Sequence, residues 1–389
     1  MTKLFWISIL LLFYTFLGYG IVLYILVKIK QAIKGKQKRA IFNNELPSLT
    51  LVVAAYNEEL FITEKIKNTL ALNYPQNKLH LIFITDGSTD RTPDLVQQFP
   101  GIQLLHTPER KGKISAVHRA MNCVKSEIVV FTDANTLLNT EALVLLAQHF
   151  SNQKIGAVAG EKRVMITERS DATAGEGFYW RYESLLKKFD AELYSVIGAA
   201  GELYAIRTDL YEPAPLNSII DDFIISLSIA RKGFKVAYEP NAYALETASA
   251  NSKEELKRKV RIAAGGIQSI IWLKDLMNPI RFPILSFQFI SHRVLRWTLA
   301  PFALILAFTM NILIVTINPA THFYYLILAG QSIFYLFALL GWVLEQKEIK
   351  VKTFFIPYYF CLMNYAVLAG IHRYFSGKQS AAWEKSMRK

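Results

Sequence analysis

The chain is 389 residues long, with 52% hydrophobic residues, 19% charged residues and a formal net charge of +13. This hydrophobic content is typical of a membrane protein, whereas the charged fraction requires a substantial region in water, so separate parts of the chain must meet both requirements. No nucleic-acid recognition motif accompanies the basic excess. Two distant cysteines, Cys123 and Cys361, indicate neither a disulfide framework nor a zinc site.

An uncharged run of apolar and aromatic residues extends from Leu4 to Val27. It exceeds the roughly 20 residues that a helix needs to cross a bilayer. No small-residue cleavage site follows, so residues 1–28 are interpreted as an uncleaved anchor rather than a signal peptide. The next residues are basic, namely Lys28, Lys30, Lys34, Lys36, Lys38 and Arg39. This pattern predicts that the region after the anchor lies in the cytoplasm, beside an anionic membrane surface.

Between residues 45 and 279, strand-like and helix-like segments alternate, which predicts an α/β domain with a mostly parallel sheet. Strands are predicted at residues 49–54, 79–85, 102–105, 128–131, 155–159 and 203–206. Helices are predicted at residues 58–72, 113–124, 179–188, 221–231 and 252–272. Ser252 is the expected N-cap of the last helix.

After Pro279 the chain becomes apolar again. Residues 282–297 are interrupted by His292, Arg293 and Arg296, which favours an interfacial helix along the membrane. Three further spans are predicted at residues 300–317, 323–344 and 354–371, the last of which is either a full span or a re-entrant segment. A basic tail occupies residues 376–389. Four full spans would put this tail outside, although its positive charges favour the cytoplasm.

Polar side chains follow the predicted strand at 128–131, where a ligand is expected. In an open α/β sheet, ligands bind beyond the carboxyl ends of the strands, and Asp133 and Asn135 lie there. Two oxygen-bearing side chains separated by the small Ala134 can approach one hard cation, such as Mg²⁺ or Mn²⁺, and leave positions for substrate phosphates. A simple turn after the strand is the alternative.

Three further polar segments are predicted at the same edge of the sheet. Asn57 and Glu58 follow the first strand, where they would either bind a ligand or cap the next helix. Asp86 follows the second strand, where its carboxylate would accept hydrogen bonds from a base or ribose, or form an Asx turn. Lys113 begins a helix whose free N–H groups suit an anion; the alternative is a solvated basic loop.

In this order, these segments resemble the motifs of the membrane-bound family 2 glycosyltransferases, the group that contains cellulose, hyaluronan and poly-N-acetylglucosamine synthases. The resemblance covers essentially the whole chain. It implies a GT-A fold, a Rossmann-like nucleotide-diphospho-sugar transferase domain, with N- and C-terminal transmembrane helices. It also implies a multi-pass protein of the inner or plasma membrane, with the catalytic domain in the cytoplasm.

The resemblance assigns roles to individual residues. Asp86 would contact the uridine, and Asp133 with Asn135 would correspond to the D-x-D metal motif. Asp222, beside Asp221, corresponds to the last residue of the T-E-D motif, which is the catalytic base. The residues expected to bind the donor nucleotide are Ala55, Tyr56, Asn57, Glu58, Asp86, Lys113 and Asp133.

The chain departs from the family pattern at two places. Asn135 supplies a neutral oxygen where a second carboxylate is usual. The Q-x-x-R-W motif of processive synthases corresponds to residues 258–262, in which Arg258 replaces the Gln and Ile262 replaces the Trp. Arg258 and Arg261 share a helix face and are expected to hold the donor diphosphate, with a solvated basic face near the membrane as the alternative. The missing Trp leaves processivity open.

The expected activity is inverting transfer from a UDP-sugar to a growing polysaccharide or glycolipid, with a possible partner subunit. Asp222 would accept the acceptor proton, and Asp221 would tune its pKa. The Gly198–Gly201 stretch would let the backbone approach the sugars. One alternative is a single-addition transferase that acts on a lipid-linked acceptor. Another is a transporter with a regulatory nucleotide-binding domain, which the scarcity of charges in the spans disfavours.

Overall fold

A computed structural model describes residues 1–35, 45–164, 173–247, 252–318, 322–347 and 351–377, with residues 320 and 349. Lys36, Lys38 and Arg39 of the basic stretch lie outside these residues, as does the tail from residue 378 onward. The same holds for the side chain of Ser252, the expected helix cap.

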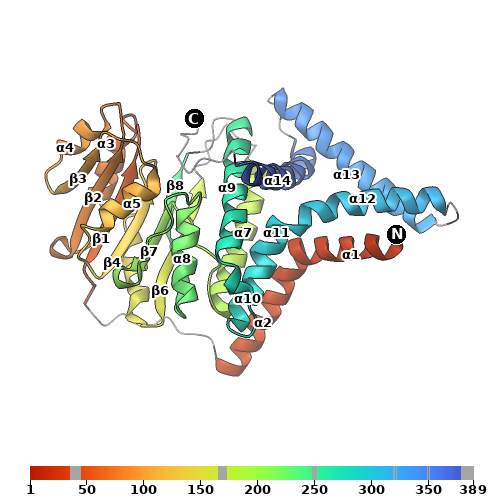
Figure 1. Ribbon diagram of the computed structural model, residues 1–389, viewed down its shortest axis with the longest axis horizontal. Coiled ribbons are helices and arrows are strands. Elements are labelled where there is room, and N and C mark those ends of the chain that lie inside the picture. Colours follow the sequence, from red (N-terminus) through yellow and green to blue (C-terminus); the bar gives the residue numbers. More distant parts are fainter. Residues whose placement is uncertain are drawn as a thin grey trace.

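An eight-stranded sheet forms the centre of the soluble region, in the order β3-β2-β1-β4-β7-β6-β8-β5 (Figure 1). Its strands are β1 (Leu49–Ala55), β2 (Leu79–Asp86), β3 (Ile102–Thr107), β4 (Ile128–Asp133), β5 (Thr136–Leu138), β6 (Ile155–Val164), β7 (Leu203–Arg207) and β8 (Lys235–Glu246). The first four strands are parallel to one another, as predicted. The other half of the sheet is mixed, which the sequence did not predict: β6 is parallel to β8, but β7 is antiparallel to both β4 and β6, and β5 is antiparallel to β8.

Helices cover both faces of the sheet. They are α3 (Ile62–Leu70), α4 (Thr92–Gln97), α5 (Lys113–Met121), α6 (Ala142–Gln148), α7 (Thr173–Leu193), α8 (Asp221–Arg231) and α9 (Ser252–Trp272). Successive residues of a strand point to opposite faces. In β1, Val52 therefore joins the core under α5 and α8, whereas Val53 joins the core under α3 and α6. Strands buried on both faces explain the continuous apolar runs in the sequence.

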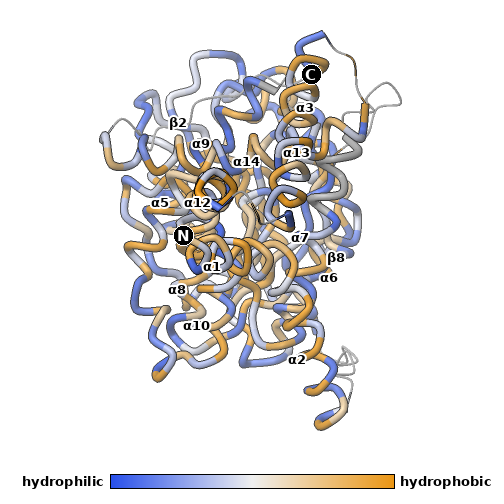
Figure 2. Tube along the Cα trace, turned by 90° about the vertical axis from the view of Figure 1, so that its right-hand side faces the viewer, coloured by the Kyte–Doolittle hydropathy of each residue, from blue (hydrophilic) through white to orange (hydrophobic). Residues whose placement is uncertain are grey.

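Four helices are long and apolar enough to cross a membrane. The first combines α1 (Thr2–Phe13), a π-helical turn at Tyr14–Gly18 and α2 (Tyr19–Lys34). The others are α12 (Leu299–Ile317), α13 (His322–Gln346) and α14 (Lys352–Phe375). Figure 1 shows α1, α12 and α13 projecting away from the sheet, and Figure 2 shows the hydrophobic character of α1 and α12. All four segments form helices where the sequence predicts them.

The last apolar segment is one unbroken helix, with Pro357 inside its second turn. The buried amide of Asn364 donates to the Phe360 carbonyl at 2.9 Å, so it does not interrupt the helix. The C-terminal part of α14 packs closely on α9, because a Cβ added at Gly370 would lie 2.6 Å from Ala263 Cβ. This contact brings an apolar helix against the helix that carries the two predicted phosphate-binding arginines.

The predicted interfacial helix forms α10 (Pro283–Phe289), a π-helical turn at Ile290–Val294 and α11 (Leu295–Trp297). Of the three basic residues that interrupt this apolar segment, two do not face outward. His292 and Arg296 are buried. His292 Nδ1 lies 2.7 Å from Asp190 Oδ2, and Arg296 pairs with Glu183, both on α7. These two basic residues fasten the helix to α7.

Candidate active site

Three strands end side by side at the edge of the sheet where the sequence predicts the site. In register, Ala54 of β1 pairs with Asp133 of β4, and Ala55 pairs with Thr85 of β2. Asp133 ends β4 and Asp86 ends β2. Parallel pairing therefore brings the polar segments that follow β1, β2 and β4 to one edge, as expected for ligand binding in an open sheet.

Lys113, the first residue of α5, reaches across this edge to Asp133. Its Nζ lies 2.7 Å from Asp133 Oδ1, and the Asp133 side chain retains 14% of its exposure. Burial by itself would lower the pKa of Lys113, but the carboxylates of Asp133, Asp221 and Asp222 together raise it. Lys113 is thus a permanent cation that faces three acidic groups.

The two aspartates Asp221 and Asp222 occupy the first turn of α8. The pKa of Asp222 is raised to about 7, first by burial and then by the neighbouring charge of Asp221, while Lys113 opposes the shift. A general base is most effective when its pKa lies near the operating pH. The environment of Asp222 therefore suits it to accept a proton at neutral pH.

The glycine-rich stretch before β7 lies against both charged groups. A Cβ added at Gly201 would lie 3.3 Å from Lys113 Nζ and 3.4 Å from Asp222 Oδ2. At Gly198, φ is +83°, and a Cβ would overlap the ring of Phe223. Glycine at these two positions lets the backbone run close to Lys113, Asp222 and Phe223.

A cavity of about 350 Å³ opens in front of these residues. This volume falls in the range typical of small-ligand sites. Its polar walls include Lys113, Asp133, Asp221, Asp222, Arg258 and Arg261. Its apolar wall comes from Trp297 of α11, Ile262 of α9 and Met363, Ala366 and Val367 of α14. The cavity thus runs from the sheet edge to a helix that is apolar enough to cross a membrane.

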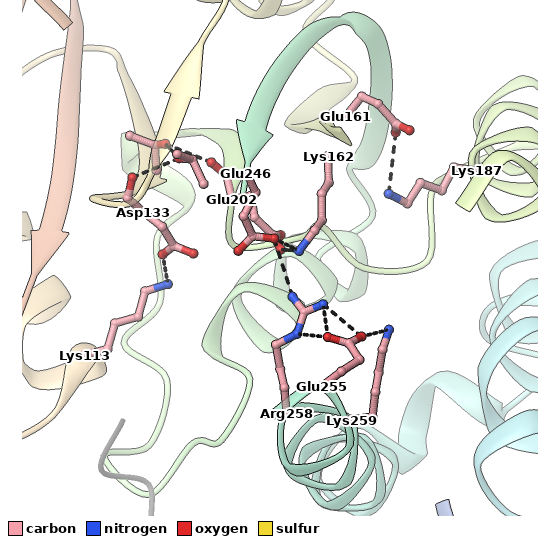
Figure 3. A network of polar contacts seen from close by, with 12 residues as sticks. Lys113, Asp133, Glu161, Lys162, Lys187, Glu202, Glu246, Glu255, Arg258 and Lys259 are labelled. Carbon is pink, nitrogen blue, oxygen red and sulfur yellow. Dashed lines mark hydrogen bonds and ion pairs between the residues drawn. The ribbon is translucent and has the colours of Figure 1, made fainter. Parts of the chain in front are cut away.

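Arg258 and Arg261 line the cavity, but their guanidinium groups already have partners. Figure 3 shows those of Arg258. Arg258 lies 2.9 Å from Glu255 Oε2 and 3.5 Å from Glu246 Oε2. Arg261 Nη2 donates to the Ile219 carbonyl at 3.1 Å. The side chain of Arg258 is only 18% exposed, so the alternative of a solvated basic face is wrong at this position. A donor diphosphate would compete with Glu255 and Glu246 for Arg258.

Asp86 holds a loop instead of forming the alternative Asx turn. Its Oδ2 accepts hydrogen bonds from the backbone N–H of Lys111 at 2.9 Å and of Gly112 at 2.6 Å. A small pocket next to it is bounded by Ala54, Ala55, Tyr56, Asp86, Arg110, Gly112, Lys113 and Ala116. The guanidinium of Arg110 stacks on Tyr56 at 4.0 Å from the ring centre. The predicted nucleotide-binding residues of the first two motifs are therefore adjacent.

Asn57 joins these two motifs to each other. It has a φ of +54°, accepts a hydrogen bond from Thr89 N at 2.8 Å and donates to Thr89 Oγ1 at 3.3 Å. The alternative that Asn57 and Glu58 cap the next helix is wrong, because α3 begins only at Ile62, with Phe61 at its N-cap. The predicted helix start at residue 58 is four residues early, since residues 58–61 form a turn.

Two buried lysines near the site were missed by the sequence reasoning. Lys162 lies 2.6 Å from Glu202 Oε1 and also pairs with Glu246, which links the sheet to Arg258 (Figure 3). Lys65 is fully buried under the turn after β4, where its Nζ donates to the Thr136 carbonyl at 2.7 Å. A signal for Lys65 existed, because it lies on the same helix face as Ile62 and Ile66.

The donor atoms around Asp133 fit a divalent cation that is shared with a substrate. The Asp133 carboxylate faces the cavity and already pairs with a cationic group, the Lys113 ammonium. Asn135 lies two residues further along the same turn. Within the described part of the chain, no cluster of three or more His, Cys, Asp or Glu residues forms a complete metal cage. A hard cation here would therefore need additional oxygens, such as those of a diphosphate.

A family model described as "Glycosyltransferase like family 2" matches residues 47–265, which is more than half of the chain. The chain belongs to glycosyltransferase family 2. The match confirms the resemblance predicted from the motifs and the expectation that the protein is a glycosyltransferase. It removes the support for the transporter alternative.

The chain is also similar to poly-beta-1,6-N-acetyl-D-glucosamine synthases. It is 25% identical to the protein of Staphylococcus aureus strain COL over 260 residues, which are 63% of this chain and 61% of that protein. It is 23% identical to the Staphylococcus epidermidis protein over 256 residues, or 63% of this chain and 60% of that one. The matched region thus spans less than two thirds of these relatives.

The chain also resembles a solved structure along nearly its whole length. The mannosyltransferase of Pyrobaculum calidifontis, in complex with GDP-Man and Mn²⁺, has a TM-score of 0.70 and 23% sequence identity. The alignment covers 97% of this chain and 100% of that one. The predicted GT-A fold is therefore confirmed, including the apolar helices at both ends.

Proposed function

We propose that this glycosyltransferase moves a hexosyl or N-acetylhexosaminyl group from a UDP-sugar to a growing polysaccharide or a glycolipid at the membrane, with inversion. The observation that carries the proposal is the convergence of Lys113, Asp133 and Asp222 on one cavity. Glycosyl transfer requires a cationic site for the departing diphosphate and a base for the acceptor hydroxyl. These three residues supply both.

In this proposal, Asp222 accepts the proton of the acceptor hydroxyl. Its pKa of about 7 keeps a substantial fraction of the carboxylate ionised at neutral pH while leaving it basic enough to take a proton. Asp221 maintains that pKa through like-charge repulsion. The acceptor oxygen attacks the anomeric carbon as the diphosphate leaves on the opposite side, through a transition state with oxocarbenium character.

Lys113, Arg258 and Arg261 hold the leaving diphosphate. A divalent cation, Mg²⁺ or Mn²⁺, bound at Asp133 and Asn135 would supply Lewis-acid stabilisation of the same group. Ala55, Tyr56, Asn57, Glu58 and Asp86 form the adjoining nucleotide site. Once a diphosphate is bound, Arg258 shares its charge between that group and its present carboxylate partners, Glu255 and Glu246.

The membrane supplies the acceptor side of the reaction. In this proposal, the four apolar helices anchor the chain, residues 45–279 form the cytoplasmic catalytic domain, and residues 280–375 return the chain to the bilayer. The apolar wall formed by Met363 and Val367 suits an acceptor that carries a lipid. Ile262, which replaces the Trp of processive synthases, also lines this wall and favours the alternative of a single addition.

The test uses the full chain, purified and reconstituted in nanodiscs. UDP-N-acetylglucosamine, UDP-glucose, UDP-glucuronic acid and GDP-mannose are offered in turn, and nucleotide release is measured against the variant Asp222→Asn. Release from at least one UDP-sugar is expected, with UDP-N-acetylglucosamine the first candidate because of the relatives' names. Gel filtration of the product separates a polymer from a single addition. Release from GDP-mannose alone would overturn the proposed donor class.

A further inference from the structure

A second cavity, remote from the catalytic residues, lies between α2 and α7. Its volume is about 540 Å³. Its apolar floor is formed by Tyr24, Val27 and Phe189, and the rings of Tyr24 and Phe189 lie 5.6 Å apart. Its polar wall consists of Lys28, Lys30, Gln31, Lys34, Lys188 and Glu192. Neither the family motifs nor the proposed sugar transfer uses these residues.

The charge of this basic pocket is strongly unbalanced. Four lysines face one carboxylate, Glu192, which accepts a hydrogen bond from Gln31 at 3.1 Å. Lys30 is directed to the end of α7, where its Nζ donates to the carbonyls of Glu192 and Leu193 at 2.6 and 2.7 Å. Lys28, Lys34 and Lys188 are exposed at the rim. The rim thus presents three ammonium groups around an apolar floor.

The positive field extends beyond the pocket. The pKa of Lys235, at the start of β8, is lowered by burial first and then by the charges of Lys154 and Lys34. Lysines that lie close enough to lower the pKa of Lys235 mark a region with more cations than anions. An anionic ligand would relieve this repulsion as well as form its own contacts.

The position of the pocket along the helix indicates where the anion comes from. The helix formed by Thr2–Lys34 has 33 residues, and at 1.5 Å per residue it is roughly 50 Å long. The hydrocarbon core of a bilayer takes up about 30 Å of that length. The uncharged run ends at Val27, so Lys28 to Lys34 lie at the level of the lipid headgroups. Ile21 and Ile25 are exposed on the same helix before Val27 and provide an apolar surface on the hydrocarbon side of these lysines.

We propose that this basic pocket binds the phosphodiester headgroup of an anionic membrane phospholipid, with the acyl chains along the exposed Ile21 and Ile25 of α2. The proposal rests on the membrane placement of Thr2–Lys34 given above, but not on the identity of the sugar donor. Helix α7 links the two cavities, because Lys188 and Glu192 line the basic pocket while Glu183 and Lys187 line the catalytic one. A bound headgroup would therefore fasten α7 against α2.

The test measures lipid binding directly on the full chain. Delipidated protein in detergent is titrated with phosphatidylglycerol or phosphatidylcholine, and bound lipid is counted by native mass spectrometry. We expect clear preference for phosphatidylglycerol. The double variant Lys34→Gln/Lys188→Gln should weaken its binding roughly 30-fold, because each lysine near an anionic lipid contributes about fivefold. This variant keeps Lys28 and Lys30, so the basic flank of the anchor persists.

The matched control is Lys67→Gln/Lys125→Gln, which removes two exposed lysines elsewhere and should leave lipid binding unchanged. Glu192→Gln removes the one carboxylate among the described residues that line the pocket and should tighten phosphatidylglycerol binding, so the proposal is tested even if the lysine variant unfolds. Equal affinity for the two lipids, or an equal loss in the control, would overturn it. Displacement of the lipid by inorganic phosphate would show that free phosphate is the ligand. UDP release in the same preparations reports separately on the sugar-transfer proposal.

Discussion

Replacing Asp222 by asparagine separates proton acceptance from the other properties of the side chain. Asparagine keeps the shape and can form hydrogen bonds, but it cannot take a proton at neutral pH. If Asp222 is the base, Asp222→Asn should lower turnover by roughly 10²- to 10⁴-fold. The affinity for the UDP-sugar should stay near the wild-type value, because the lost interaction acts only in the transition state.

The same substitution should not destabilise the protein. The pKa of Asp222 is about 7 in the folded chain, against a usual value of 3.8. Because the pKa of Asp222 is raised in the folded chain, this residue stabilises the folded state fully only when the pH is below its pKa in the unfolded chain. That contribution to stability is lost as the pH rises through about 7. At about 1.4 kcal/mol per unit, a shift of about three units gives an upper limit of about 4 kcal/mol of strain in the ionised native state. Asp222→Asn removes this strain, so above pH 7 it should unfold at a higher temperature than the wild type.

The assay combines turnover, donor affinity and thermal melts of the two variants Asp222→Asn and Asp221→Asn across neutral pH. In the wild type, kcat/KM should fall as the pH drops below about 7, because the base becomes protonated. In Asp221→Asn, this fall in kcat/KM should occur at lower pH, because the pKa of Asp222 decreases when the neighbouring negative charge is lost. The effect on maximal turnover should be milder than in Asp222→Asn. Normal turnover in Asp222→Asn together with an inactive Asp221→Asn would identify Asp221, rather than Asp222, as the base. Normal turnover in both would refute the reasoning.

Three further predictions concern the metal, the topology and the core. Asp133→Ala should abolish transfer and chelators should silence the wild type; full activity in excess chelator, measured by UDP release, would contradict a metal at this position. Protease added to intact spheroplasts should leave residues 45–279 uncut, whereas cleavage without lysis would reverse the proposed orientation. Lys65→Met should lower the free energy of unfolding by about 1–3 kcal/mol, because the buried Thr136 carbonyl loses its donor; an unchanged thermal melt would show that another group satisfies it.

Local patterns in the chain were sufficient to predict several parts of the molecule. The helix at Ser252–Trp272 and the four apolar helices have periodicity or length that depends only on neighbouring residues. Asp133 and Asp86 were placed correctly at strand ends, because an apolar run that stops at a polar residue marks the end of a buried strand. Parallel pairing of the first four strands then followed from their alternation with helices.

Features of the fold that depend on contacts between residues far apart in the chain could not be predicted from local patterns. β5 is only three residues long, and β8 pairs with β6 across a separation of about 80 residues, so neither produced a recognisable local signal. The antiparallel direction of β7 depends on how the chain returns to the sheet. For the same reason the inward placement of His292 was missed, because its partner Asp190 is 102 residues away in the chain.

At the candidate site, too, some features could be predicted from the sequence and others depend on the tertiary structure. The sequence by itself identified the residues that are proposed to carry the chemistry, because Asp133, Asp222 and Lys113 each stand in a recognisable motif. Only the tertiary structure decided their electrostatic state and surroundings. The pKa of Asp222 depends on burial and on Asp221 and Lys113, Arg258 is paired with carboxylates from α9 and β8, and the packing of α14 on α9 supplies the apolar wall. Burial and charge pairing arise from residues far apart in the chain, and they exist only once the fold has brought those residues together.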